Sequence, residues 1–153
     1  MIDRFTNKLL QIETECLNPQ DAILIRLFLE GVEIHEVIYL KKNSLNPMTG
    51  MLTVTDATGR KRCLQVSRKC VELYQRAVQQ AFYVFETKTL IVPLMDSAYL
   101  IKASVTDYTA HERMLDQMDT VILRTVDERL RNLAEIYNCP DLTYLPTGIT
   151  AGC

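Results

Sequence analysis

The 153-residue chain lacks several features that would assign it directly to a class of protein. Its net charge is −2, from 17 basic and 19 acidic residues, so no overall positive field indicates a nucleic acid or an anionic membrane as its partner. Its longest apolar runs, such as TLIVPLM, are far shorter than the roughly 20 residues of a membrane-spanning helix. Any binding to DNA or lipid would therefore depend on a local patch of charge.

Cysteine motifs are also missing. The five cysteines form no CxxC pair and no cluster with His35 or His111, so the spacing of a zinc site is absent. An odd number of cysteines and the lack of a signal peptide favour a reduced, cytoplasmic setting. We therefore expect no metal, no cofactor, no membrane association and no small-molecule substrate.

No arrangement of residues specifies an enzyme by itself. The segment TGITAGC has neither the preceding strand nor the following helix of a phosphate-binding loop. His111 and Arg113 have no serine or cysteine nucleophile at a recognisable spacing. His35 lies between Glu33 and Glu36, and one histidine beside acids on a short helix is more often a surface or capping group than a catalytic one.

Hydrophobic periodicity predicts a mainly helical domain. The clearest helix has Asn18 as its cap, Pro19 in its first turn and Gly31 at its left-handed stop. Its centre, AILIRLFL, is apolar nearly all round, so we expect it in the core. Ser67 caps another helix, whose buried stripe is expected to include Phe82. In all, helices are predicted over residues 1–17, 19–30, 34–40, 68–85 and 119–139.

Strand signals are concentrated in MLTVTDATGRKRCLQVS, residues 51–67. Leu52 and Val54 alternate with threonines, and a turn around Gly59 precedes a second strand, which predicts a β-hairpin. TLIVPLM and AYLIKAS are short strands or extended connections, and Pro93 argues against a central strand. HERMLDQM is expected to form a helical turn, and the tail LTYLPTGITAGC shows no periodicity. The predicted class is α+β, mainly helical, with a small antiparallel sheet.

A group of basic residues lies in and beside the hairpin. A protruding basic loop can follow a phosphate backbone, although solubility is an equally ordinary reason for its charge. The candidate DNA-binding residues are Arg60, Lys61, Arg62, Lys41, Lys42, Arg68 and Lys69.

The order of these elements resembles the catalytic domain of tyrosine recombinases, the phage-integrase family. There a helix leads to TGLRxSELxxLxWxDI and then to a hairpin of roughly LxVxGKGxKxRxVPLS. In EGVEIHEVIYL and the hairpin, the family's glycine, acid, leucine and arginine match Gly31, Glu36, Leu40 and Arg62. The resemblance covers roughly residues 18 to 150 and is looser in the second half. It implies an amino-terminal helix or linker over 1–17 and a degenerate integrase-like domain over 18–153.

The departures from the family concern its catalytic residues. The arginine that binds the scissile phosphate corresponds to Glu33. The hairpin lysine falls near Ala57, although Lys61 is close enough to leave the register open. The HxxR motif corresponds to YLPT, residues 144–147, and the tyrosine nucleophile would lie beyond Cys153. The family's amino-terminal core-binding domain is expected to be missing as well.

The resemblance and its departures together imply a protein without recombinase activity. We expect a non-catalytic DNA-binding protein of a bacterium or phage, either a regulator of a phage or mobile element or a vestigial integrase. Its partners would be DNA and a second copy or a partner recombinase. The alternative is a module for protein interaction or oligomerisation that does not bind DNA, which the net negative charge favours.

Overall fold

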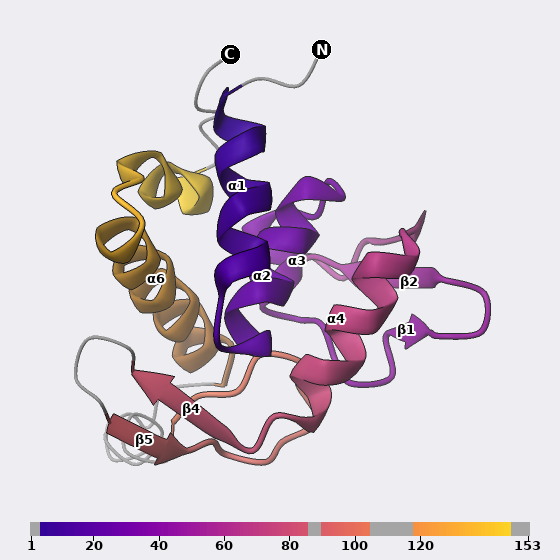
Figure 1. Cartoon of the computed structure of the whole chain (residues 1–153). Helices are drawn as coiled ribbons and strands as arrows, with labels where there is room; N and C mark the ends of the chain where they lie inside the picture. The colour runs from indigo at the N-terminus through magenta and orange to yellow at the C-terminus, as the bar shows by residue number, and fades with distance from the viewer. Residues whose placement is uncertain (1–3, 86–89, 105–117, 148–153) are drawn as a thin grey trace.

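The computed structural model describes residues 4–85, 90–104 and 118–147. In Figure 1 the helices form the body of the molecule, and the three-stranded sheet projects from the side opposite α6. No helix among the described residues is long and apolar enough to cross a bilayer. The elements are α1 (Arg4–Glu15), α2 (Pro19–Leu29), α3 (Ile34–Val37), β1 (Leu45–Asn46), β2 (Met51–Thr55), β3 (Lys61–Gln65), α4 (Arg68–Gln79), β4 (Phe82–Phe85), β5 (Leu90–Pro93), α6 (Met118–Ile136) and the 3₁₀ helix η1 (Pro140–Thr147).

Helix α2 is the centre of the core, as its apolar sequence predicts. It packs against both α1 and α4. Pro19 begins the helix, and Gly31 follows its end with φ of +94°, a conformation that glycine adopts without strain. Asn18 occupies the cap position, but its side chain does not cap α2. Its amide is bonded instead to the backbone of Val84 in β4, so the predicted capping bond is replaced by a link between two elements.

Helix α1 is joined to the core by apolar contacts and by an ion pair. Leu9 and Ile12 are buried in the same cluster as α2. Arg26 of α2 donates to the buried carboxylate of Glu13 at 2.7 Å and also pairs with Glu30 at 3.1 Å. Because a buried carboxylate without a partner is costly, this guanidinium fixes α1 against α2.

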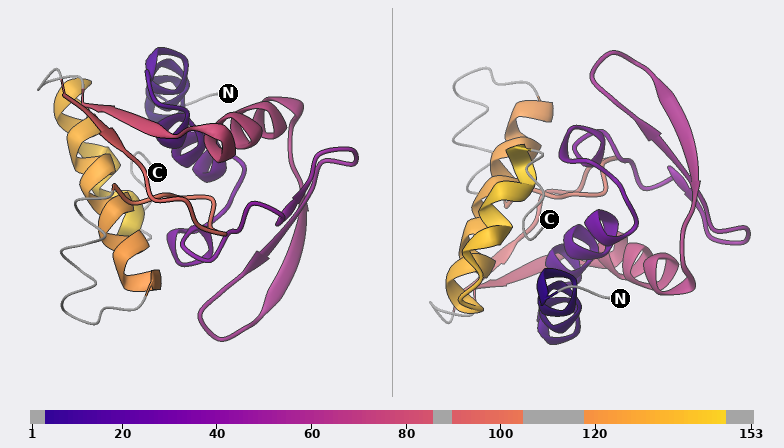
Figure 2. Two further views of the ribbon diagram at one scale, coloured as in Figure 1. Left: turned by 90° about the horizontal axis from the view of Figure 1, so that it is seen from below. Right: turned by 90° about the horizontal axis from the view of Figure 1, so that it is seen from above.

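The predicted hairpin is confirmed and belongs to a three-stranded antiparallel sheet, ordered β1-β2-β3. Leu52 and Val54 of β2 are fully buried, and Val54 lies opposite Arg62. In the turn, the carboxylate of Asp56 accepts backbone N–H groups of Thr58 and Arg60. Figure 2 shows the tip of this hairpin extending beyond the helices. The two-residue strand β1 was not predicted, since so short a segment gives no periodic signal.

The predicted helix over 68–85 is correct only as far as Gln79. Ser67 caps it, with its hydroxyl accepting from the N–H of Cys70 at 3.2 Å. The aromatic and β-branched run after it forms strand β4, which pairs with β5. Phe82 is 58% exposed and lies outside the buried stripe, so its prediction as a core residue is wrong. Pro93 ends β5, which agrees with its exclusion from a central strand.

The remaining segments differ in how far they match expectation. AYLIKAS forms no extended strand. Isolated β-bridges join its Tyr99 to Lys41 and its Ser104 to Leu94. HERMLDQM lies outside the described residues apart from Met118. Helix α6 is confirmed, but it ends at Ile136 rather than at Pro140, which instead begins η1. The aperiodic tail therefore contains a 3₁₀ helix.

A buried polar network connects α6 to α2 and α4. The guanidinium of Arg129 donates to the side-chain oxygen of Gln20 at 2.9 Å and to the carbonyl of Lys102. Gln20 is fully buried, and its amide donates to the carbonyls of Ala77 and Leu100. The Arg129 guanidinium also lies 4.7 Å from the ring centre of Tyr83. One arginine therefore holds segments that are distant in the sequence.

Candidate nucleic-acid interface

Two of the residues that match the recombinase pattern meet where α3 faces β3. The Arg62 guanidinium donates to both carboxylate oxygens of Glu36, each at 2.7 Å, and to the carbonyl of Gly31 at 2.9 Å. The Glu36 side chain is only 7% exposed, whereas that of Arg62 is 44% exposed. This two-point geometry fixes the start of β3, next to the turn of the hairpin, against α3.

The ion pair affects the acidity of both partners. The hydrogen bond from Arg62 lowers the pKa of Glu36, while burial works in the opposite direction. The same bond raises the pKa of Arg62. Since the Glu36 pKa is lowered on folding, the pair stabilises the fold above the unfolded pKa of about 4.3. Its contribution is lost as the pH falls through the lowered value.

Glu33, which the resemblance to recombinases matches to an arginine, belongs to the same group of charges. Its backbone N–H donates to Glu36, and its own carboxylate lies 2.9 Å from Nε2 of His35. The charge of Glu33 also contributes to the raised pKa of Arg62. We refer to Glu33, His35, Glu36 and Arg62 as the α3–β3 cluster. It contains two carboxylates and one permanent cation, so its net charge is negative when His35 is neutral.

The basic residues predicted around the hairpin do not form a single patch. Arg60 and Lys61 are exposed at the hairpin tip, and neither has an ion-pair partner within the part of the chain that the structure describes. Lys42 pairs with Asp96 at 2.6 Å. Lys41 is exposed beside it and pairs through its backbone with the 98–100 segment.

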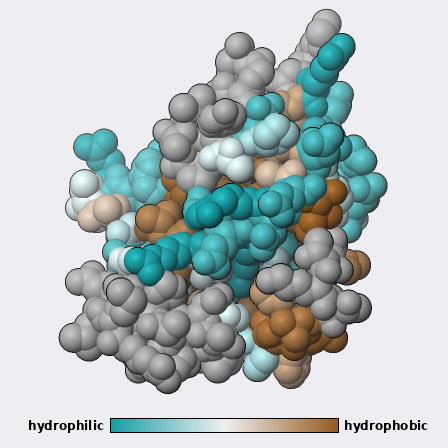
Figure 3. Space-filling model, turned by 90° about the vertical axis from the view of Figure 1, so that its left-hand side faces the viewer, coloured by the Kyte–Doolittle hydropathy of each residue, from teal (hydrophilic) through white to brown (hydrophobic). Residues whose placement is uncertain are grey.

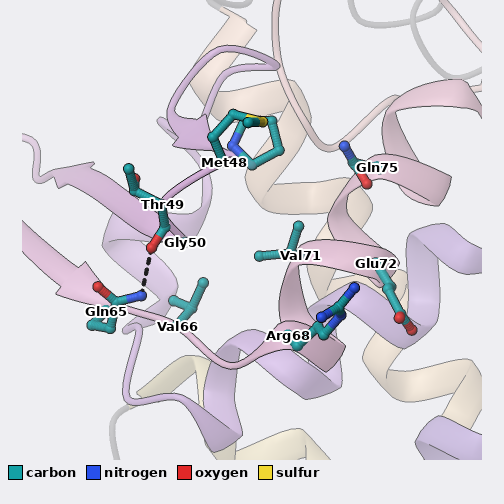
Figure 4. A pocket seen from close by; sticks show the side chains of 10 residues that line it. Met48, Thr49, Gly50, Gln65, Val66, Arg68, Val71, Glu72 and Gln75 are labelled. Carbon is teal, nitrogen blue, oxygen red and sulfur yellow. Dashed lines mark hydrogen bonds between the residues drawn. The ribbon is translucent and has the colours of Figure 1, made fainter.

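Arg68 and Lys69 lie at the start of α4, beyond the end of β3 that is opposite the tip. Figure 4 shows Arg68 on the wall of an open pocket of about 540 Å³ between α4 and the turn that joins β1 to β2. Gln65 closes one side by donating to the carbonyl of Thr49 at 2.7 Å. This pocket does not include the α3–β3 cluster, so the residues of the recombinase pattern lie elsewhere.

Among the described residues, neither a metal-binding group nor a reactive form of the buried Cys70 is found. They contain no group of three His, Cys, Asp or Glu side chains placed to hold a metal ion. Burial raises the pKa of the Cys70 thiol to about 12, so this cysteine is protonated at neutral pH. The segment YLPT lies in η1, and the positions of its side chains are outside the description.

The sequence and fold were compared with known proteins. A family model described as "MrpR, C-terminal catalytic domain" matches residues 5–149. No curated protein matches the chain. Among solved structures, the crystal structure of XerA recombinase shares 13% identity with a TM-score of 0.49. That match covers 99% of this chain and 60% of the XerA chain, so the chain spans less than two thirds of the length of that solved protein.

The family model covers nearly the whole chain, including the α3–β3 cluster and the hairpin. The expectation of a recombinase-like catalytic domain, mainly helical with small antiparallel sheets, is confirmed. The protein belongs to the MrpR C-terminal catalytic domain family.

Proposed function

We propose that this protein is a non-catalytic DNA-binding protein, acting as a regulator of a phage or mobile element or persisting as a vestigial integrase. The observation that carries the proposal is the carboxylate of Glu33 in the α3–β3 cluster, a residue that the resemblance matches to the recombinase phosphate-binding arginine. A second carboxylate, Glu36, lies in the same cluster and already engages Arg62.

The charge of the cluster opposes phosphoryl transfer. Recombinase chemistry needs cations where negative charge develops on the phosphate oxygens. At about 4 Å and an effective dielectric constant of about 20, one carboxylate repels a phosphate charge by roughly 4 kcal/mol. Arg62 could offset part of this repulsion, but its Nε and Nη2 groups donate to Glu36 and Gly31. A scissile phosphate is therefore poorly stabilised in this cluster.

The hairpin tip remains suited to DNA binding without chemistry. Arg60 and Lys61 are exposed at the turn of the hairpin, which extends beyond the helices (Figure 2). In contrast, Lys42 pairs with Asp96 and Arg62 with Glu36. Contacts between exposed basic side chains and phosphate groups fix where a protein lies on DNA, but they do not read the base sequence. Since few cations are involved, binding should be weak and strongly dependent on salt.

Substituting both tip residues, Arg60→Ala with Lys61→Ala, should weaken DNA binding. We expect the affinity for a short duplex at low salt to fall about tenfold, and the slope of log affinity against log salt to decrease by about 2, one for each lost phosphate contact. Fluorescence anisotropy over a salt series measures both quantities.

The matched control removes two cations from α1, Arg4→Ala with Lys8→Ala. It changes the net charge equally but should leave affinity and slope close to those of the wild type. If the tip variant binds like the wild type, or if both variants lose affinity equally, the hairpin tip is not the contact surface.

A further inference from the structure

Strand β3 forms one edge of the three-stranded sheet, and the hydrogen bonds of β2 show which of its backbone groups point outward. Thr53 lies directly opposite Cys63, yet the N–H of Thr53 donates to the carbonyl of Ser44, on the β1 side. In an antiparallel pair, two opposite residues either exchange both hydrogen bonds or direct both groups away from each other. The N–H and carbonyl of Cys63 therefore point away from β2, to the outer edge of β3.

Both ends of the hairpin agree with this alternation. The N–H of Val66 donates to the carbonyl of Gly50 at 2.9 Å, and the N–H of Asp56 donates to the carbonyl of Arg60 at 3.0 Å. Each contact lies an odd number of positions from the outward pair, where hydrogen bonds between the two strands are expected. The alternation therefore holds along the whole of β3.

The residues of β3 that share the outward phase are Lys61, Cys63 and Gln65. All of them are exposed, and within the part of the chain that the structure describes their backbone N–H and carbonyl groups have no hydrogen-bond partner. The strand contains no proline, and Figure 2 shows its hairpin extending beyond the helices. A row of such unpaired groups is a template for another strand.

The charge of this edge decides which strand it accepts. Lysine at a strand edge repels a basic strand, such as β3 of a second copy, and attracts an acidic one. The carboxylate of Glu36 lies on the other face of the sheet, where it engages Arg62. Hydrophobic surface lies elsewhere, near the lower edge of the opposite side of the molecule in Figure 3. The exposed face of β2 and β3 carries no carboxylate; its side chains are Met51, Thr53, Thr55, Lys61, Cys63 and Gln65.

We propose that the outer edge of β3 binds an extended acidic segment of another protein, which joins the sheet as a fourth, antiparallel strand. Antiparallel pairing lets one residue of the segment satisfy both outward groups of Cys63, and main-chain bonds of this kind supply the affinity. Carboxylates beside Lys61 and Arg60, which have no ion-pair partner among the described residues, select an acidic sequence. Because the same two cations carry the proposed DNA contact, the segment and DNA exclude each other, a consequence that rests on the proposed function.

The size of the contact sets the strength of this association. One short strand added to an edge buries much less than the roughly 1,000 Å² of a stable interface. We therefore expect an isolated peptide to bind with a dissociation constant of roughly 0.1 to 1 mM. A segment held close to β3 by other contacts of its protein would bind more tightly, because its effective concentration is higher.

A fluorescent peptide, Thr-Val-Thr-Thr-Glu-Glu, tests the proposal on the full chain without DNA. Aligned antiparallel, it places valine opposite the half-buried Leu64 and the glutamates opposite Lys61 and Arg60. Fluorescence anisotropy should show binding, and lysine in place of both glutamates should weaken it about tenfold or more. N-methylation of the third residue, whose N–H faces Cys63, should also weaken binding about tenfold. N-methylation of the second residue, whose N–H faces away, should change binding less than about threefold.

Variants of the protein test the same contact from the other side. Arg60→Ala with Lys61→Ala should weaken binding of the acidic peptide about tenfold, whereas Arg4→Ala with Lys8→Ala should leave it unchanged. Equal binding of the acidic and lysine peptides, equal effects of the two N-methylations, or no binding up to about 1 mM overturns the proposal. A chain that dimerises without binding the peptide assigns the edge to a second copy and overturns it too. Since no DNA is present, this proposal and the proposed function fail independently.

Discussion

Replacing Glu33 with arginine is expected to raise the affinity for duplex DNA about tenfold at low salt. The substitution restores the cation of the recombinase pattern and changes the local charge by two beside Arg62. Glu33 is 64% exposed, so solvent screens part of the effect, and the gain should shrink as salt rises. Fluorescence anisotropy with one duplex at several salt concentrations measures it.

Two controls separate the α3–β3 cluster from net charge. Glu33→Gln removes the carboxylate without adding a cation, so its affinity should lie between those of the wild type and Glu33→Arg. Glu15→Arg makes the same charge change at an exposed position on α1 and should have a much smaller effect. An equal gain from Glu15→Arg would mean that overall charge, and not the cluster, limits DNA binding.

Arg129→Ala should lower the free energy of unfolding by about 3 kcal/mol. The substitution leaves the buried carbonyl of Lys102 without its guanidinium donor and removes one of the donors to Gln20. It also empties the space beside the Tyr83 ring and deletes the cation over it. Urea denaturation followed by circular dichroism measures the change.

The matched control is Arg131→Ala on the same helix. Arg131 is exposed and pairs with Asp127 one turn away, so its loss should leave the urea midpoint close to that of the wild type. If the two variants are equally stable, Arg129 does not hold α6 to α2, and apolar packing alone joins these elements.

The sequence predicted the elements whose signals are local. Helix α2 has a proline at its start, an apolar centre and Gly31 after its end, all within about fifteen residues. The hairpin likewise shows alternation on both sides of a turn. The periodicity after Ser67 gives no clear stop at Gln79 and therefore predicts too long a helix, because only pairing with β5 decides that FYVF is a strand.

Contacts between distant residues could not be read from periodicity. Glu36 and Arg62 were named separately from the recombinase pattern, and only the fold shows that they form a pair. Arg129 meets Gln20 across 109 residues. One signal was present in the sequence: Arg129 lies at helical spacing from Val126 and Leu133, on the apolar face of α6. A charged residue within such a stripe indicates a buried partner.

The proposal that this protein carries out no recombination chemistry is tested most directly by incubating the full chain with end-labelled duplex DNA and separating the products under denaturing conditions. The charge of the α3–β3 cluster predicts that complexes visible on a native gel at low salt leave only intact, protein-free strands after denaturation. A labelled strand that is cut, or that stays covalently attached to the protein, would show that Glu33 does not prevent phosphoryl transfer and would contradict the account.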